Sequence, residues 1–195
     1  MNFRGWEIPK RFRPFEEEYT VLKDNIALLD LSFQGIIELR GKDRTRFLHG
    51  MVTNDIQNLS VGQGCYALML TPQGKILTDM SIFCSEEALI LMIDSDLIEK
   101  NITLLRKYII SDQVEVVDRS SELTVVSLQG PKATEMLNLS NTDRNLPTAP
   151  FEHFQTNMGG TSVRCVRMSR TKAGGYDLIL AHTALVDLWN TLLST

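Results

Sequence analysis

The sequence predicts an α+β fold in which antiparallel sheets carry helices packed on one face. Two observations lead to this class. Apolar strand patterns come in hairpins separated by single helices, without a strict β-α alternation. The 195 residues are 43% hydrophobic and 23% charged, as in ordinary globular proteins, so the chain is long enough to bury a core without disulfides or metal.

The first 60 residues predict two helices and one strand. Residues 16–29 carry apolar side chains at helical spacing, with Ile26 and Leu29 continuing the pattern, which indicates an amphipathic helix. Residues 35–39 form a short apolar strand. Asp43 follows as an N-cap for the next helix, because its side chain can accept hydrogen bonds from the free N–H groups of a first turn.

A β-hairpin is predicted next. Residues 65–71 and 76–83 are strands, and Pro72-Gln73-Gly74 between them has the pattern of a type I turn. Side chains alternate between the two faces of a strand, so Asp79 falls on a partly apolar face. Aspartate is disfavoured there unless it is exposed, paired or functional. Asp79 is therefore a candidate functional residue, and the alternative is a solvated or hydrogen-bonded strand aspartate.

The rest of the chain continues the α+β order. Residues 88–93 are a fully apolar strand, and Asp94 or Ser95 caps the helix that follows. The later patterns predict strands over 114–117 and 123–129, a short helix from Pro131 to Leu139, a linker or long loop over 140–150, strands over 162–168 and 176–181, and a helix over 184–193. No internal repeat is visible.

Composition excludes several classes of protein. With 20 Lys+Arg against 24 Asp+Glu, the net charge of −4 argues against a nucleic-acid partner. No apolar run approaches the roughly 20 residues of a membrane span, so we expect no membrane association. Cys65, Cys84 and Cys165 are odd in number and far apart, which indicates unpaired thiols and a cytoplasmic location. No cysteine or histidine pair has the spacing of zinc ligands, so no metal site is expected.

Several motifs, which together cover almost the whole chain, carry a family resemblance. They are Gly41-Lys-Asp-Arg-Thr-Arg-Phe-Leu48, Thr53-Asn-Asp-Ile56, Thr71-Pro-Gln-Gly-Lys-Ile-Leu-Thr-Asp79, Leu128-Gln-Gly-Pro-Lys-Ala133 and Ser169-Arg-Thr171. The sequence resembles the glycine-cleavage T-protein (aminomethyltransferase) family, whose superfamily also includes the YgfZ-type folate-binding proteins. The resemblance implies an aminomethyltransferase folate-binding-domain-like fold. It divides the chain into a folate-binding subdomain over residues 1–118 and a second α+β subdomain over 119–195, packed against the first.

The same resemblance implies a site for tetrahydrofolate or a folate derivative. Asp79 falls on the family's catalytic aspartate, which lies beside the reactive nitrogen of tetrahydrofolate. A carboxylate held on a sheet face can orient an amine electrostatically, so the chemistry of the residue agrees. Asp94 falls on a family asparagine that contacts the pterin, and its alternative role is helix capping. Tyr66 and Arg170 are further candidates for lining the cavity, and each has a structural alternative.

Two departures from the family pattern limit the expected activity. Lys172-Ala173-Gly174 stands where the family loop supplies a glutamate, and the C-terminal β-barrel of the family is absent, so we expect a fragment or a truncated member. We expect this chain alone to be inactive as a transferase. The T-protein branch implies a lipoylated carrier protein as partner, and the YgfZ branch implies iron–sulfur enzymes. The alternative function is a non-catalytic structural or interaction module with an incomplete folate pocket.

Overall fold

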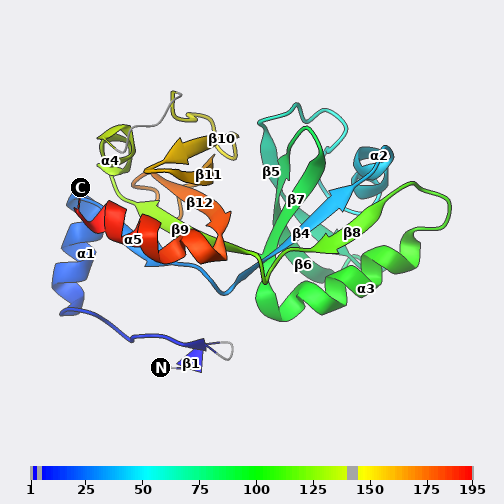
Figure 1. The fold of residues 1–195 in the computed structure, drawn as a ribbon. Helices are drawn as coiled ribbons and strands as arrows, with labels where there is room; N and C mark the ends of the chain where they lie inside the picture. The colour runs from blue at the N-terminus through cyan, green and yellow to red at the C-terminus, as the bar shows by residue number, and fades with distance from the viewer. Residues whose placement is uncertain (1, 4–5, 140–144, 195) are drawn as a thin grey trace. The chain divides into compact units, whose positions relative to one another are not determined.

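The computed structural model describes residues 2–3, 6–139 and 145–194, and it consists of two compact units (Figure 1). Unit 1 contains residues Met1–Phe33, Leu123–Pro150 and Phe154–Thr195, and unit 2 contains Gln34–Glu122 and Phe151–His153. The sequence-based division after residue 118 lies near the junction at residue 122. It differs in two respects, because the structure groups residues 1–33 with the C-terminal part of the chain and residues 151–153 with unit 2.

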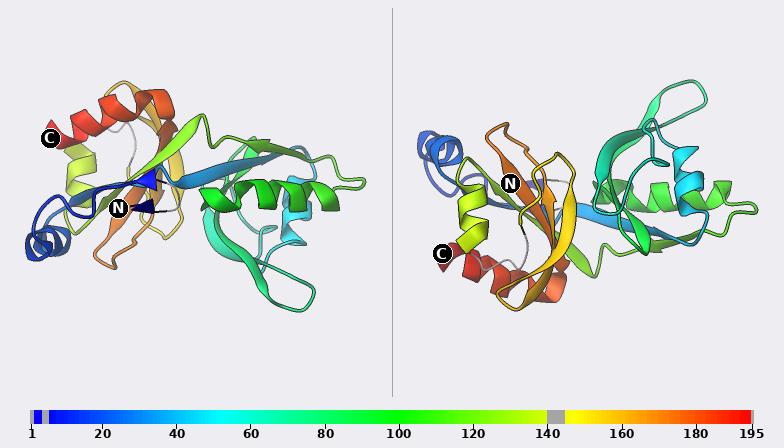
Figure 2. Two further views of the ribbon diagram at one scale, coloured as in Figure 1. Left: turned by 90° about the horizontal axis from the view of Figure 1, so that it is seen from below. Right: turned by 90° about the horizontal axis from the view of Figure 1, so that it is seen from above.

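Unit 2 is a five-stranded antiparallel sheet with helices on one face. The sheet order is β5-β6-β7-β4-β8. Its strands are β4 (Gln34–Arg40), β5 (Gly64–Leu70), β6 (Ile76–Cys84), β7 (Ala88–Asp94) and β8 (Glu115–Asp118), and its helices are α2 (Arg44–His49), the 3-10 helix η1 (Ser95–Leu97) and α3 (Ile98–Tyr108). Side chains from alternate strand positions, such as Met80 and Ile82, form one core with Leu48 of α2 and Leu105 of α3. The long helix α3 runs along the sheet in all views (Figure 2).

Unit 1 has the same plan. Its sheet order is β10-β11-β12-β9-β3. The strands are β3 (Ala27–Asp30), β9 (Leu123–Gln129), β10 (His153–Met158), β11 (Thr161–Arg167) and β12 (Gly175–Ala181), with the two-residue strands β1 (Asn2–Phe3) and β2 (Trp6–Glu7) apart from the sheet; the helices are α1 (Phe15–Asp24), α4 (Ala133–Leu139), the 3-10 helix η2 (His182–Ala184) and α5 (Leu185–Ser194). Leu137 of α4 and Leu188 and Leu192 of α5 pack with Val126 and Leu178 of the sheet.

The two units are therefore structural repeats, although the sequence shows no repeat. In each, a strand, a helix, three strands, a 3-10 helix and a long helix follow in the same order, from β4 to α3 and from β9 to α5. Each sheet is completed by an edge strand that precedes the other repeat. β3 pairs with β9, and β8 pairs with β4, both antiparallel. The strand that precedes each repeat thus forms an edge of the sheet of the other repeat.

A glycine in the left-handed region ends the first long strand of each repeat. Gly41 (φ 100°) follows β4 and Gly130 (φ 130°) follows β9. A Cβ at Gly41 would lie 2.2 Å from the carbonyl oxygen of Gln113, and one at Gly130 would lie 2.3 Å from that of Asn25. These carbonyls lie just before the edge strands β8 and β3. Only glycine permits both the positive φ angle and the close approach of the segment that leads into the edge strand.

Two sequence-based expectations about unit 1 were wrong. The helix predicted over residues 16–29 ends at Asp24, and Ala27–Asp30 form strand β3, because Leu29 pairs with Ser127 of β9 rather than continuing a helical face. Strand β10 was not predicted because its sequence, His-Phe-Gln-Thr-Asn-Met, is too polar to show an apolar alternation. Residues 140–144 of the loop predicted over 140–150 lie outside the described residues, and residues 145–150 form neither a helix nor a strand.

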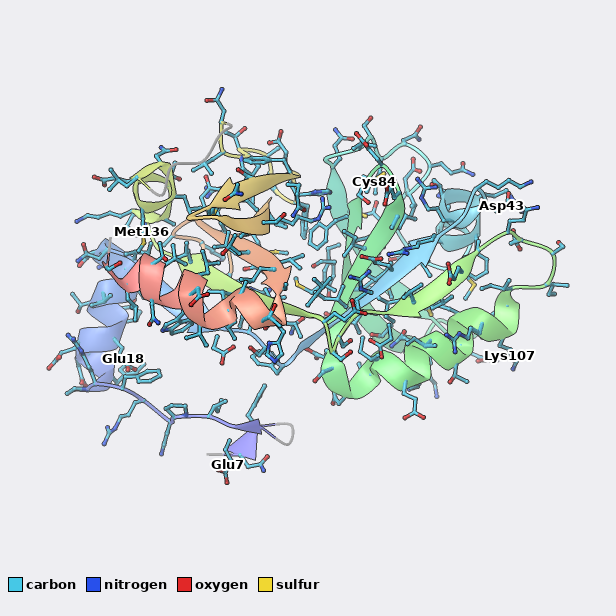
Figure 3. The ribbon with its side chains drawn as sticks, in the orientation of Figure 1. Glu7, Glu18, Asp43, Cys84, Lys107 and Met136 are labelled. Atoms are coloured by element: carbon cyan, nitrogen blue, oxygen red, sulfur yellow. The ribbon has the colours of Figure 1, made fainter. Side chains whose placement is uncertain are left out.

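Predicted caps also differ from the structure. Asp43 stands directly before α2 (Figure 3), but its side chain makes no capping hydrogen bond. Its carboxylate instead accepts a hydrogen bond of 2.8 Å from the backbone N–H of Gln113, and this bond is the main reason that the pKa of Asp43 is lowered. Asp43 therefore ties the start of α2 to the segment that leads into β8.

Candidate functional site

The face of the unit 2 sheet opposite α2 and α3 carries the candidate site. Along β6, Thr78, Met80 and Ile82 are buried, and the last two belong to the core under the helices. Asp79 and Ser81 alternate with them and point to the opposite face. The side chain of Asp79 is exposed on this face. The predicted hairpin is confirmed as well, since Gly74 N–H donates to the carbonyl of Thr71 at 2.8 Å.

Tyr66 of β5 holds the carboxylate of Asp79. The register pairs Tyr66 with Ser81 and Leu68 with Asp79, so Tyr66 and Asp79 are diagonal neighbours on one face. The tyrosine hydroxyl donates a hydrogen bond of 2.9 Å to Oδ2 of Asp79. This bond, followed by partial burial, raises the pKa of Tyr66, so the hydroxyl remains a donor. Oδ1 of Asp79 has no hydrogen-bond partner among the described residues, and it is left to accept one from a ligand.

Tyr66 is itself positioned by the segment before β5. Asn54 donates from Nδ2 to the carbonyl of Tyr66 at 2.9 Å. The next residue of that face, Leu68, exchanges hydrogen bonds with Thr53, because its N–H donates to Oγ1 and its carbonyl accepts the N–H of Thr53, each at 2.9 Å. The Thr53-Asn54 motif seen in the sequence therefore supports the outer edge of β5, where Tyr66 lies.

The hydrogen-bonded ladder between β6 and β7 ends close to the two candidate carboxylates. Paired residues run from Cys84↔Leu89 to Ser81↔Met92. Asp79 lies two residues before Ser81, and Asp94 lies two residues after Met92, so alternation places both on the same face as this last pair. The two acids therefore stand on neighbouring strands just beyond the point where pairing stops.

Asp94 is paired with Gln34 rather than used as a helix cap. Gln34, the first residue of β4, lies directly opposite Asp94, the last residue of β7. Its Nε2 donates to Oδ1 of Asp94 at 3.0 Å. Asp94 precedes η1, yet its side chain makes no capping hydrogen bond there, so the capping interpretation was wrong. Sequence reasoning missed Gln34, because an uncharged residue outside any motif gives no signal until the strand register is known.

Arg170 lies in unit 1, within a closed ring of hydrogen bonds. Its Nε and a terminal nitrogen donate to the two carboxylate oxygens of Asp177, at 3.2 and 2.5 Å. Ser127 donates to the same carboxylate at 2.6 Å, and Gln129 donates to Ser127 at 2.8 Å. The side-chain oxygen of Gln129 accepts the backbone N–H of Arg170 at 2.8 Å and closes the ring. The structure therefore joins Tyr66 with Asp79 and Gln34 with Asp94, and gives Arg170 separate partners.

The ring leaves room for no side chain at Gly175. A Cβ there would lie 2.4 Å from Nε2 of Gln129. Gln129 also donates to the carbonyl of Met168 at 2.9 Å, so the segment from Met168 to Gly175 is held at both ends. Between them, Lys172 (φ 64°) and Gly174 (φ 93°) form a tight left-handed turn that contains no acidic side chain.

The described residues offer neither a metal-binding cluster nor a membrane-spanning helix. No group of three His, Cys, Asp or Glu side chains there is arranged to hold a metal ion. No helix in that part of the chain is both long and apolar enough to cross a membrane. The three cysteines are free thiols.

Comparisons with known proteins agree with the fold and with the resemblance. The model of the GCVT N-terminal domain matches residues 1–195. The aminomethyltransferase of Chloroherpeton thalassium is 29% identical over 195 residues, which cover 99% of this chain and 54% of that protein. The aminomethyltransferase of Geobacillus sp. (strain WCH70) is 32% identical over 197 residues, covering 99% and 53%. The chain thus spans about half the length of the curated relatives it matches.

Solved structures share the same fold. The glycine cleavage system aminomethyltransferase T from Bartonella henselae superposes with a TM-score of 0.78 at 22% identity, covering 91% of this chain and 48% of that one. A chain of the heterotetrameric sarcosine oxidase from Corynebacterium sp. U-96 superposes with a TM-score of 0.65 at 16% identity, covering 87% and 82%. The expected α+β class, with antiparallel sheets and helices on one face of each, is confirmed.

Proposed function

Because the chain belongs to the GCVT N-terminal domain family, we propose that it forms the tetrahydrofolate-binding part of a T-protein-type aminomethyltransferase. The observation that carries the proposal is the Tyr66–Asp79 pair on the helix-free face of the unit 2 sheet. A strand aspartate with one oxygen fixed by a tyrosine and the other available to a ligand is arranged for recognition of a polar group rather than for core stability.

The chemistry of these side chains fits a reduced folate. The pterin ring carries several N–H donors, which call for carboxylate acceptors, and a flat apolar face, which an aromatic ring can cover. Asp79 and Asp94 supply acceptors on one sheet face, and Tyr66, with 48% of its surface exposed, supplies the ring. These two aspartates are therefore the acids proposed to meet the pterin.

In the proposed reaction, bound tetrahydrofolate supplies the nitrogen that accepts a one-carbon unit. Asp79 would accept a hydrogen bond from that amine through Oδ1 and so fix the direction of its lone pair. Its negative charge would also stabilise positive charge that develops at the nitrogen. Tyr66 would keep the carboxylate in one rotamer through Oδ2, which reduces the reorganisation that binding requires.

Arg170, by contrast, is proposed to have a structural role within unit 1. Its guanidinium is already occupied by Asp177, and breaking that pair would strand a fully buried carboxylate. We therefore propose that Arg170 shapes the turn that follows it rather than gripping the ligand directly.

The proposed partner is a lipoylated carrier protein, and the proposed location is the cytoplasm, in line with three free thiols. The relatives described above are named aminomethyltransferases, which favours the T-protein branch over the YgfZ branch with its iron–sulfur enzymes. The interaction-module alternative has no support in these comparisons, and the following titration separates it from folate binding.

Isothermal titration with 5-formyltetrahydrofolate tests the proposal. We expect saturable heat from the wild-type chain and a loss of affinity of about tenfold or more in Asp79→Asn, because a hydrogen bond to a charged group is lost. Asp187→Asn, an exposed aspartate of α5, is the matched control and should bind like wild type. No heat from a sample shown to be folded by circular dichroism would refute folate binding. Equal affinities in wild type and Asp79→Asn would remove Asp79 from the site.

A further inference from the structure

Gln34 and Asp94 form a second polar pair on the sheet face that carries Asp79. The register makes them directly opposed residues of β4 and β7, and Nε2 lies 3.0 Å from Oδ1. Directly opposed residues share a face, and Asp79 is on the same face of the adjacent strand β6. The open end of this sheet therefore presents an amide beside one carboxylate and near another.

The backbone that carries Gln34 is held on both sides. A Cβ at Gly35 would lie 2.3 Å from Cγ1 of Ile98, so β4 lies directly against the start of α3. The N–H of Ile36 donates to Oγ of Ser120 at 3.0 Å. Gln34 thus begins a strand whose position is fixed from its second residue onward, which is the kind of support that a recognition residue needs.

The orientation of the Gln34 amide is determined by its partner. An ionised carboxylate only accepts hydrogen bonds, so the NH₂ end of the amide must face Asp94. One N–H is used in this bond. The second N–H and the carbonyl oxygen of Gln34 have no hydrogen-bond partner within the described part of the chain. A partly buried amide with unused groups gains free energy when a ligand satisfies them.

We propose that Gln34 contacts the ligand directly, donating its second amide N–H to a carbonyl oxygen next to the N–H groups that Asp94 accepts. This inference rests on the proposed folate function. The edge of a pterin has that order of groups, because the 2-amino group and N3–H are donors and the neighbouring 4-oxo group is an acceptor. A carboxylate with an amide at its side is complementary to this edge, whereas a carboxylate alone would repel the oxo group.

Titration of variants with 5-formyltetrahydrofolate tests the assignment. Gln34→Met keeps the volume of the side chain and removes both amide groups. It should weaken binding about 5- to 10-fold, the value of one neutral hydrogen bond whose partner is left unsatisfied. Gln155→Met is the matched control, because Gln155 also donates from Nε2 to a side chain, Ser162, but in unit 1. It should bind like wild type.

A double-mutant cycle separates direct contact from an effect through Asp94. If Gln34 only orients Asp94, adding Gln34→Met to Asp94→Asn should cost no more affinity than Asp94→Asn alone, and the assignment is overturned. If Gln34 contacts the ligand, the double variant should bind at least about 3-fold more weakly than Asp94→Asn. Equal binding by wild type and Gln34→Met also overturns it. A folded wild-type chain that gives no heat instead refutes the proposed function itself, and the inference falls with it.

Discussion

Asp177 is a buried charged residue of unit 1 whose removal should lower the stability of that unit. Its side chain is fully buried and accepts hydrogen bonds from Ser127 and from two nitrogens of Arg170. Through Gln129, the same ring fixes the backbone of Arg170. Asp177→Ala leaves a guanidinium and a hydroxyl without their acceptor and opens a small cavity.

The structure sets the magnitude of this effect. Removing one partner of a buried ion pair costs about 3–5 kcal/mol, because the other charge stays unpaired. The Arg170 side chain is 31% exposed, so water can reach part of the orphaned charge, and the lower end, about 3 kcal/mol, is the better value. For a chain of this size that corresponds to a decrease in Tm of about 6–12 °C. Asp177→Asn should cost nearly as much, because it keeps the volume but turns amide N–H groups toward donors.

Urea unfolding at pH 7, followed by far-ultraviolet circular dichroism, measures the difference. Asp112→Asn is the control. It breaks the ion pair with Arg46, whose side chain is 64% exposed and can be rehydrated, so less than about 1 kcal/mol should be lost. If Asp177→Ala costs no more than this control, the ring does not stabilise unit 1, and the structural role given to Arg170 is wrong.

Three further predictions concern other parts of the chain. Tyr66→Phe should lower the affinity for 5-formyltetrahydrofolate about 3- to 10-fold but change the stability by less than about 1 kcal/mol, since the hydrogen bond from its hydroxyl to Asp79 is exposed. Calorimetry measures the affinity and thermal unfolding the stability, and an unchanged affinity contradicts the positioning role. Burial raises the pKa of Cys165 to about 12, so the folded thiol keeps its proton while the unfolded one loses it above about pH 8.5. The free energy of unfolding should therefore fall by about 1–2 kcal/mol as the pH rises from 8 to 10. Urea unfolding of Cys165→Ala should show a fall that is smaller by this amount, and an equal fall in both proteins would exclude the thiol as its cause. Gly130→Ala should destabilise unit 1 by more than about 2 kcal/mol, because a methyl group would collide with the backbone before β3. Gly74→Ala, also at positive φ but in open space, should cost only about 1 kcal/mol in the same assay. Equal losses would mean that the pairing of β3 with β9 does not require the glycine.

Local patterns predicted the hairpin and the position of Asp79 well. The strands expected over 65–71 and 76–83 appear as Gly64–Leu70 and Ile76–Cys84, because a hairpin depends on neighbouring residues and one turn. The face of Asp79 followed from alternation alone. Its hydrogen bond to Tyr66 required the register as well, which the turn sets.

Long-range pairing explains what the sequence could not predict. Ile26 and Leu29 fit a helical period, and only the presence of β9 almost a hundred residues later makes the second of them a strand residue. The repeat could not be seen in the sequence, because the order and the backbone path of the strands and helices repeat while the side chains do not. Asp94 and Ala181 precede equivalent 3-10 helices with nearly identical dihedral angles, φ −59° and −62°, yet share no side-chain chemistry. Gln34 became visible for the same reason, through its register with Asp94.

The pairing of the edge strands β8 and β3 also determines which sheet can be completed first during synthesis on the ribosome. All five strands of the unit 2 sheet are made once β8 is complete, whereas β3 leaves the ribosome roughly 90 residues before β9, the strand with which it pairs. At about 5–20 residues per second, β3 waits about 5–20 s with its backbone N–H and C=O groups unpaired. Its length of four residues and its terminal charge at Asp30 limit the chance that another nascent chain pairs with it in that interval.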